Sequence, residues 1–212
     1  MQPLMNQFKQ ATEFLAQQDS DWAWLIATVG ECSFSAKSER EPYEALTRAV
    51  AYQQLSTKVG DKLIDKLVSR FGHFPLPHEL VAADFESLRA IGFSVRKIDT
   101  LKAIASGVLS GLVPSREVAN HMSNEALIAR LVSIKGIGQW TVEMMLIFTL
   151  GRLDILPVDD FGILAGYMRL KKLDALPKRK EMMRIAQAWS PCRTIASWYL
   201  WRVPKELESI KS

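Results

Sequence analysis

The sequence predicts an all-α protein, and three observations support this fold class. Apolar residues recur at three- and four-residue spacing along most of the 212 residues, as in Tyr43, Leu46, Ala49 and Val50. Capping residues and breakers divide the chain into many short segments. No segment alternates polar and apolar residues as a half-buried strand would. We therefore expect a helical bundle without a β-sheet.

The expected helices follow one another with short connections. The stretches with helical periodicity are 8–15, 22–29, 42–52, 58–71, 84–88, 95–108, the two helices that flank 136–138, 161–170, 178–189 and 191–202. Asp19, Asp84 and Ser123 precede helices as N-cap residues, and Gly30 and Gly92 follow helix ends. In the helix over 58–71, Val59, Leu63 and Leu67 are expected on the buried side.

The C-terminal third has its own boundary signals. The residue before Pro157 is disfavoured in the helical region, so the chain should cross 156–158 in an extended conformation. Asp159 or Asp160 should begin the next helix, and Asp159 is the expected cap. Ser190 and Pro191 should supply the N-cap and first position of the last helix.

Composition and charge bound the class of protein. With 48% hydrophobic and 24% charged residues, the chain has the composition of a soluble globular protein. A formal charge of +4 and a sequence pI near 9.1 are compatible with a polyanionic partner. Cys32 and Cys192 lie far apart, which argues against a zinc site, an iron–sulfur cluster and a disulfide framework. We expect no signal peptide, no membrane span and a reducing compartment.

The short loop between two apolar helices is the most informative stretch. It contains Gly136 and Gly138, and so tight a loop needs residues that tolerate positive φ and close backbone approach. The pattern is typical of a helix-hairpin-helix. Because Gly138 opens the second helix, the N–H groups of its first turn point outward with the positive end of the helix dipole behind them. This arrangement suits a bound phosphate.

Four motifs in order resemble those of the helix-hairpin-helix DNA glycosylases. They are Tyr52-Gln-Gln-Leu-Ser56, Ile134-Lys-Gly-Ile-Gly-Gln-Trp-Thr141, Pro157-Val-Asp-Asp160 and Pro191-Cys-Arg-Thr-Ile-Ala-Ser-Trp-Tyr-Leu-Trp201. The resemblance is strongest to the 3-methyladenine DNA glycosylase II branch and spans roughly residues 20–203. It implies a hydrolase of base excision repair that removes alkylated purines, 3-methyladenine and 7-methylguanine among them.

The resemblance also assigns roles to residues. Asp160 matches the catalytic aspartate of the family, and the aromatic and thioether side chains of Trp140, Trp201 and Met144 are expected to line the base pocket. The expected DNA contacts come from the loop that wedges into the duplex and from the hairpin; they are Gln54, Leu55, Ser56, Lys135, Gly136 and Gly138. No cofactor is required. In relatives, hairpin carbonyls hold a monovalent cation, and the matching carbonyls are those of Val132, Ile134 and Gly136.

Each of these residues also has an ordinary structural explanation. An aspartate before a helix is a common N-cap, which is compatible with catalysis. A tryptophan on a helix usually fills core, as expected for Trp22, Trp24, Trp189 and Trp198. Leu55 could anchor two helices instead of entering a duplex. Asp160 is therefore assigned by the order of the motifs and not by its position alone.

One departure from the superfamily indicates the reaction type. Glycosylases that also cleave the strand carry a lysine two residues after the second hairpin glycine, and here that residue is Trp140. We therefore expect a monofunctional enzyme without lyase activity. The 1–212 chain should form one glycosylase domain of two lobes, about 43–151 and about 1–42 plus 152–212, with the active cleft between them.

The partner implied is double-stranded DNA that contains alkylated bases, bound by a monomer in the cytoplasm at the nucleoid or in a nucleus. Two alternatives stay open from the residues. The chain could be a non-catalytic helix-hairpin-helix module that binds DNA damage, or the same fold could act on another damaged base.

Overall fold

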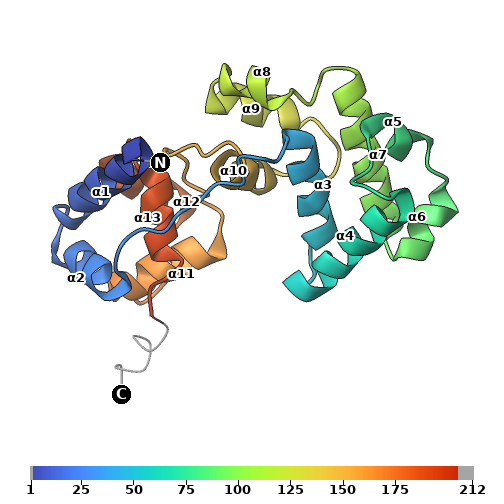
Figure 1. Ribbon diagram of the computed structural model, residues 1–212. Coiled ribbons are helices and arrows are strands. Elements are labelled where there is room, and N and C mark those ends of the chain that lie inside the picture. Colours follow the sequence, from blue (N-terminus) through green and yellow to red (C-terminus); the bar gives the residue numbers. More distant parts are fainter. Residues whose placement is uncertain (1, 205–212) are drawn as a thin grey trace. The chain divides into compact units, whose positions relative to one another are not determined.

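The computed structural model describes residues 2–204, and every regular element in that range is a helix (Figure 1). The all-α prediction is confirmed. The chain divides into two compact units, one formed by residues 1–35 and 152–212 and the other by residues 36–151. None of the described helices has the length and apolar character needed to cross a membrane.

The first unit joins the two ends of the chain. Its elements are α1 (Gln2–Ala16), α2 (Ser20–Val29), α11 (Phe161–Leu170), α12 (Arg179–Ile185), the 3-10 helix η1 (Ala186–Trp189) and α13 (Arg193–Leu200). In Figure 1 the blue α1 and α2 lie beside the orange and red α11 and α13, as their contacts require. The ring of Trp22 packs edge-on against Trp189 at 5.2 Å between centroids, and both are buried. Aromatic packing of this kind joins the N-terminal and C-terminal segments.

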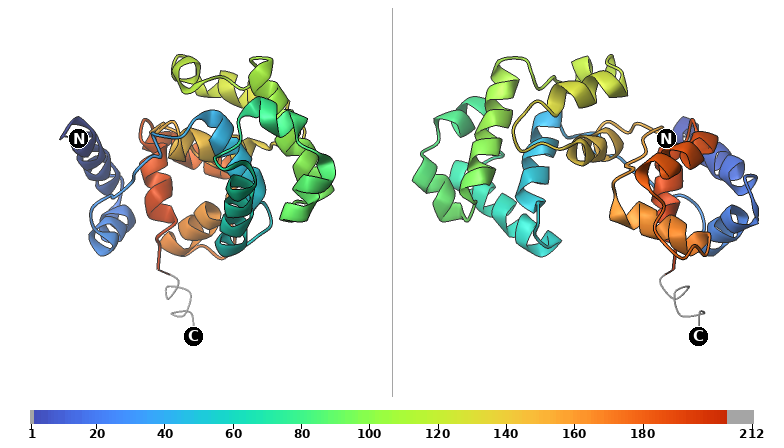
Figure 2. Two further views of the ribbon diagram at one scale, coloured as in Figure 1. Left: turned by 45° about the vertical axis from the view of Figure 1, so that its right-hand side comes forward. Right: turned by 180° about the vertical axis from the view of Figure 1, so that it is seen from behind.

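The second unit is continuous in sequence. Its elements are α3 (Pro42–Tyr52), α4 (Thr57–Phe71), α5 (Pro77–Ala82), α6 (Phe85–Ile91), α7 (Val95–Leu109), α8 (Arg116–Asn120), α9 (Asn124–Leu131) and α10 (Gln139–Phe148). Helix α3 lies against α4, α7 and α10, which can be followed in both views of Figure 2. Leu46 and Val50 of α3 are fully buried with Leu101 and Ile104 of α7, so α3 is the central helix of this unit.

Most helix boundaries follow the sequence signals. The side chains of Asp19, Asp84 and Ser123 accept hydrogen bonds from backbone N–H groups of α2, α6 and α9, as predicted. Gly30 and Gly92 end their helices at positive φ. Local capping chemistry therefore determines where these helices begin and end.

Two side-chain placements and several helix bounds differ from the predictions. Helix α1 begins at Gln2, the helix expected over 178–189 divides into α12 and η1, and the short helices α5 and α8 were not predicted. Val59 is 44% exposed and Trp24 is 42% exposed, so neither is core. Ser190 and Pro191 do not cap the last helix, which begins at Arg193 after Cys192. The Ser190 hydroxyl donates to the Asp154 carboxylate at 2.9 Å instead, because the chain at 152–155 lies against the start of α13.

Candidate functional site

The hairpin tip exposes its backbone because two isoleucines anchor it. Ile134 and Ile137 are each 4% exposed, and the Ile137 N–H donates to the Ile134 carbonyl at 3.0 Å. Lys135 and Gly136, which lie between the two isoleucines, and Gly138, which follows them, are exposed. The predicted hairpin contacts therefore share one solvent-facing loop between α9 and α10.

The two hairpin glycines serve different purposes. Gly136 has φ +92°, and a Cβ there would lie 2.1 Å from Thr100 Oγ1. Gly138 is the N-cap of α10 at φ −90°, and no protein atom lies within 4 Å of where its Cβ would be. The expected positive φ is therefore found at Gly136 alone. At Gly138 the missing side chain leaves the first turn of α10 without a capping group, which suits close approach by an external anion.

The expected wedge loop lies next to the hairpin in the same unit. Residues 53–56 connect α3 to α4, and the Gln53 side-chain amide donates to the Gly136 carbonyl at 3.3 Å. Gln54 has φ +58°, an unusual conformation for a residue with a side chain. Leu55 is 40% exposed although it is apolar. The structure thus brings the loop and the hairpin together and leaves Leu55 accessible.

Tyr52, the first residue of the 52–56 motif, and Gly60, which has no predicted role, support this loop. A Cβ at Gly60 would lie 2.2 Å from the Tyr52 ring, so only glycine lets the ring pack on α4. The Tyr52 hydroxyl donates to the Asp61 carboxylate. Burial raises the pKa of Tyr52, and its hydrogen bond to Asp61 adds to the effect. The sequence signal for this packing was Gly60 itself, a glycine inside an otherwise helical pattern.

A pocket of about 630 Å³ opens between these elements of the second unit. Trp140, 44% exposed, and Met144 line it together with Gln53 and Gln54. Lys97 also lines it, and its ammonium donates to the carbonyl of Ala51 at 2.8 Å near the end of α3. Burial lowers the pKa of Lys97. Gly136 completes the lining, so two predicted base-pocket residues and two predicted DNA contacts, Gln54 and Gly136, share a single concave surface.

The carbonyls matched to a cation site have compatible chemistry. The Ile134 carbonyl accepts from Ile137 N–H, and the Gly136 carbonyl accepts from Gln53. A carbonyl oxygen has two lone pairs, so each can accept a second partner. Oxygen ligands suit a hard cation, and the carbonyl of Val132 would supply a third oxygen donor. Among the described residues, no group of three or more His, Cys, Asp or Glu side chains could hold a metal.

Asp160 occupies the N-cap of α11 in the first unit. Its Oδ1 accepts from the Ile163 backbone N–H at 3.0 Å and from the Trp201 indole N–H at 2.8 Å. Asp159, predicted to be the cap, instead forms an ion pair with Arg179 of α12 and is largely exposed. The prediction for Asp159 is wrong because its carboxylate pairs with Arg179, twenty positions along the chain, and does not cap the helix.

The Trp201 side chain is thereby placed beside Asp160. Trp201 is the C-cap residue of α13 and is half-buried. Its neighbour Trp198, by contrast, is 5% exposed, with the Arg202 guanidinium 3.7 Å from its ring centroid. The expectation that Trp198 fills core is confirmed, and the assignment of Trp201 to the base pocket stays a prediction.

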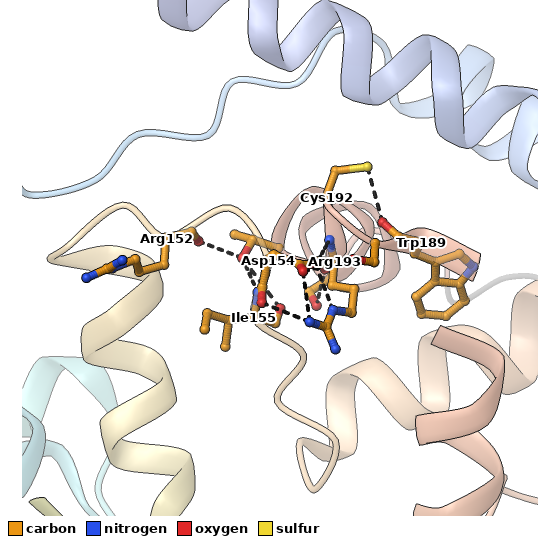
Figure 3. A network of polar contacts seen from close by, with 9 residues as sticks. Arg152, Asp154, Ile155, Trp189, Cys192 and Arg193 are labelled. Atoms are coloured by element: carbon orange, nitrogen blue, oxygen red, sulfur yellow. Dashed lines mark hydrogen bonds and ion pairs between the residues drawn. The ribbon is translucent and has the colours of Figure 1, made fainter. Parts of the chain in front are cut away.

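A polar network orders the segment that leads to Asp160 (Figure 3). The Asp154 carboxylate accepts from Arg193 Nε at 2.6 Å and from a second Arg193 nitrogen at 2.8 Å. The Thr194 hydroxyl donates to the Arg152 carbonyl at 2.7 Å and accepts from the Ile155 N–H at 3.0 Å. These contacts attach residues 152–155 to the first turn of α13, whose other end carries Trp201.

Asp154 keeps its charge in this network. Burial alone would raise its pKa, but hydrogen bonds from Arg193 and Ser190 outweigh burial, and the pKa lies below its ordinary value. Nothing in the sequence marked Asp154 and Arg193 as partners, because they are 39 positions apart.

Comparison with known proteins identifies the family. Residues 47–192 match the model of the HhH-GPD superfamily of base excision DNA repair proteins. The chain belongs to this superfamily. The resemblance drawn from four motifs is confirmed, and the match includes the hairpin, the 157–160 motif and the start of the last motif.

Individual HhH-GPD proteins are similar over most of their length. DNA-3-methyladenine glycosylase 1 of Schizosaccharomyces pombe is 46% identical over 194 residues, which cover 90% of this chain and 85% of the relative. The solved structure of the S. pombe 3-methyladenine DNA glycosylase in complex with abasic DNA has a TM-score of 0.84 at 45% identity, covering 91% of this chain and 95% of that one. A DNA-3-methyladenine glycosidase from Bacillus halodurans has a TM-score of 0.82 at 32% identity, covering 91% and 88%.

Proposed function

We propose that this chain is a monofunctional DNA glycosylase that hydrolyses the N-glycosidic bond of alkylated purines in duplex DNA. Its substrates are 3-methyladenine and related lesions such as 7-methylguanine. The observation that carries the proposal is Asp160, a carboxylate at the family's catalytic position with Oδ1 held by two N–H donors at 2.8 and 3.0 Å. The 46% identity to a 3-methyladenine glycosylase supports the substrate class.

Asp160 stabilises the positive charge that develops on the sugar as the bond breaks. An N-alkylated purine is cationic, so its bond to the sugar is already weak. At ~4 Å and an effective dielectric of about 20, the attraction is roughly 4 kcal/mol. If this gain is confined to the transition state, it accelerates the reaction on the order of a thousandfold. A general-base role toward the attacking water would supply about 10²–10⁴.

Trp140 and Met144 provide the surface for the damaged base. The exposed indole of Trp140 attracts a cationic ring by ~0.5–2 kcal/mol more than a neutral one. Stacking depends little on the pattern of donors and acceptors on the base. Substrate choice should therefore be broad among cationic purines.

The DNA itself is held by the hairpin and opened by the loop. Gly136, Gly138 and Lys135 contact phosphates, which fixes the position of the duplex without reading its sequence. Leu55 enters the base stack to hold it open while the damaged nucleotide is extruded. Gln54 and Ser56, exposed beside it, contact the bases left behind.

Trp140 also sets the reaction type. Strand cleavage by this superfamily needs an amine that forms a Schiff base with the sugar, and an indole cannot supply one. The product is therefore an abasic site in an intact strand.

A monovalent cation on the carbonyls of Val132, Ile134 and Gly136 would neutralise the bound phosphate. We expect a monomer that acts where the chromosome lies, in the nucleoid or a nucleus.

The test is release of methylated bases from methylated duplex DNA under single-turnover conditions. Asp160→Asn should lower the rate on the order of a thousandfold. The matched control is Asp159→Asn, an adjacent exposed carboxylate paired with Arg179, which should stay within about threefold of wild type. Wild-type protein that binds the DNA but releases no base would leave a damage-binding module as the function. Strand cleavage without added base or heat would contradict the monofunctional assignment.

A further inference from the structure

Helix α11 carries two glycines one turn apart, Gly162 and Gly166, and both face α13. A Cβ at Gly166 would lie 2.1 Å from the carbonyl oxygen of Leu200 in α13. A Cβ at Gly162 would lie 2.9 Å from Trp201 Cδ1 and 3.0 Å from Asp160 Oδ1. Real Cβ atoms essentially never approach other heavy atoms closer than 3.0 Å, so a larger residue would move Leu200 and Trp201 and crowd Asp160.

Glycine is unfavourable for helix stability at these two positions. Glycine in a helix interior is less favourable than alanine because it loses more backbone entropy on folding. Neither residue has positive φ, so backbone conformation does not demand glycine. What both positions lack is room for a side chain. The two glycines therefore set how closely the C-terminal turn of α13 approaches α11.

The close approach brings Trp201 to Asp160. The indole N–H donates to Asp160 Oδ1 at 2.8 Å, and the Ile163 N–H donates to the same oxygen at 3.0 Å. A carboxylate is planar and turns about one bond, so two donors on one oxygen restrict that rotation. One donor comes from α11 itself and the other from the end of α13. The orientation of the carboxylate thus depends on the spacing of the two helices.

We propose that Trp201 is a positioning residue for Asp160, and that Gly162 and Gly166 hold α11 and α13 at the spacing this contact requires. The proposal rests on the proposed glycosylase function and assigns Trp201 a role beyond a wall of the base pocket. A preorganised carboxylate stabilises the developing sugar cation without reorganising during the reaction. Loss of the contact should therefore slow base release and leave DNA affinity unchanged.

The test compares Trp201→Phe, Gly162→Ala and the double variant in single-turnover base release and in binding to abasic DNA. Trp201→Phe keeps an aromatic ring and removes the N–H, which should cost about 10–100-fold in rate, as for a hydrogen bond to a charged group. Gly162→Ala keeps both partners and displaces them, so a loss of similar size is expected. Because both changes break one contact, the double variant should be no slower than the slower single variant. The dissociation constant should change less than about twofold in each.

Trp198→Phe is the matched control, since it replaces a buried tryptophan of the same helix whose ring packs against the Arg202 guanidinium. Its rate should stay close to that of wild type. The proposal is overturned if Trp201→Phe or Gly162→Ala retains the wild-type rate, if their losses multiply in the double variant, or if the loss lies in affinity alone. Either of the last two results would make Trp201 a stacking surface only.

A second readout does not depend on activity. In protein labelled with ¹⁵N-tryptophan, the indole N–H signal that disappears in Trp201→Phe belongs to Trp201. This signal should shift in Gly162→Ala and in Asp160→Ala, while the Trp198 indole signal stays in place. An unchanged Trp201 signal in Asp160→Ala would overturn the positioning contact even if wild type is active. Conversely, a wild-type protein that releases no base but shows these shifts would contradict the proposed function and still support the contact between Trp201 and Asp160.

Discussion

Alanine substitutions at the two hairpin glycines should act on different properties, one on stability and the other on DNA binding. Gly136→Ala places a side chain at φ +92° and a Cβ 2.1 Å from Thr100 Oγ1. Gly138→Ala places a Cβ where no protein atom lies within 4 Å, at an ordinary φ of −90°. The first change should therefore destabilise the protein, and the second should act only on a ligand.

The size of the first effect follows from two costs at Gly136. A non-glycine residue held in a sparsely populated backbone region costs about 1–3 kcal/mol. Forcing an extra atom into a packed site costs about 1–3 kcal/mol more. The free energy of unfolding should thus fall by about 2–6 kcal/mol in total. For a chain of this size the melting midpoint should fall by about 4–24 °C, at about 2–4 °C per kcal/mol.

Urea unfolding followed by circular dichroism measures these changes. Thr100→Ala, added to Gly136→Ala, removes the two nearest atoms, at 2.1 and 2.9 Å, and leaves the Thr100 Cβ at 3.1 Å. The double variant should recover the steric part of the loss and keep the backbone part. Thr100→Ala alone is the control, because its hydroxyl also donates to the Arg96 carbonyl. A stable Gly136→Ala variant would refute the steric reasoning.

Gly138→Ala should unfold within about 0.5 kcal/mol of wild type. Its DNA affinity should fall, because the new methyl group lies at the N-terminus of α10, where a phosphate is proposed to approach the backbone amides. The measurement is a titration of labelled abasic duplex at several salt concentrations. Wild-type affinity for DNA in Gly138→Ala would refute the assignment of these amides to a phosphate.

Two further predictions concern charged residues. Lys135→Ala should reduce the slope of log Kobs against log salt by about 0.9 while saturated base release stays unchanged, and an unchanged slope would remove Lys135 from the phosphate contacts. Asp154→Asn should cost about 1–3 kcal/mol at neutral pH. Because the folded pKa of Asp154 is lowered, this stabilisation is present above the unfolded value of about 3.9 and is lost as pH falls through the folded pKa. The stability difference between wild type and Asp154→Asn should therefore shrink below about pH 4 in acid titrations, and a constant difference would contradict it.

Local signals in the sequence were enough to predict most of the helices and the family, although the short helices α5 and α8 were missed. Caps such as Asp19 and Ser123 act within three residues, so their effect is visible in sequence. The motif order led to Asp160, but either carboxylate of the pair could have been the cap. The choice depends on Arg179, whose ion pair with Asp159 forms only in the folded chain.

Contacts between distant segments were beyond sequence reasoning. The bond from Trp201 to Asp160 spans 41 positions and depends on the spacing of two helices. Gly162 and Gly166 did give a sign, since two glycines one turn apart are unfavourable in a ten-residue helix without a packing reason. The wrong prediction that Ser190 caps the last helix has the same origin, because its hydroxyl donates to the carboxylate of Asp154, which lies 36 positions earlier.

The division of the chain also sets an order of events during synthesis. Residues 36–151, which form one compact unit, are translated while α1 and α2 lack their partners, because α11 and α13 come only later. At about 5–20 residues per second, the intervening stretch takes roughly 6–23 s to make. During that time the apolar faces of α1 and α2, Trp22 and Leu25 among them, have no native core to enter. The unit that carries Asp160 is therefore completed last, and a nascent chain holds the whole hairpin before it holds the carboxylate proposed as catalytic.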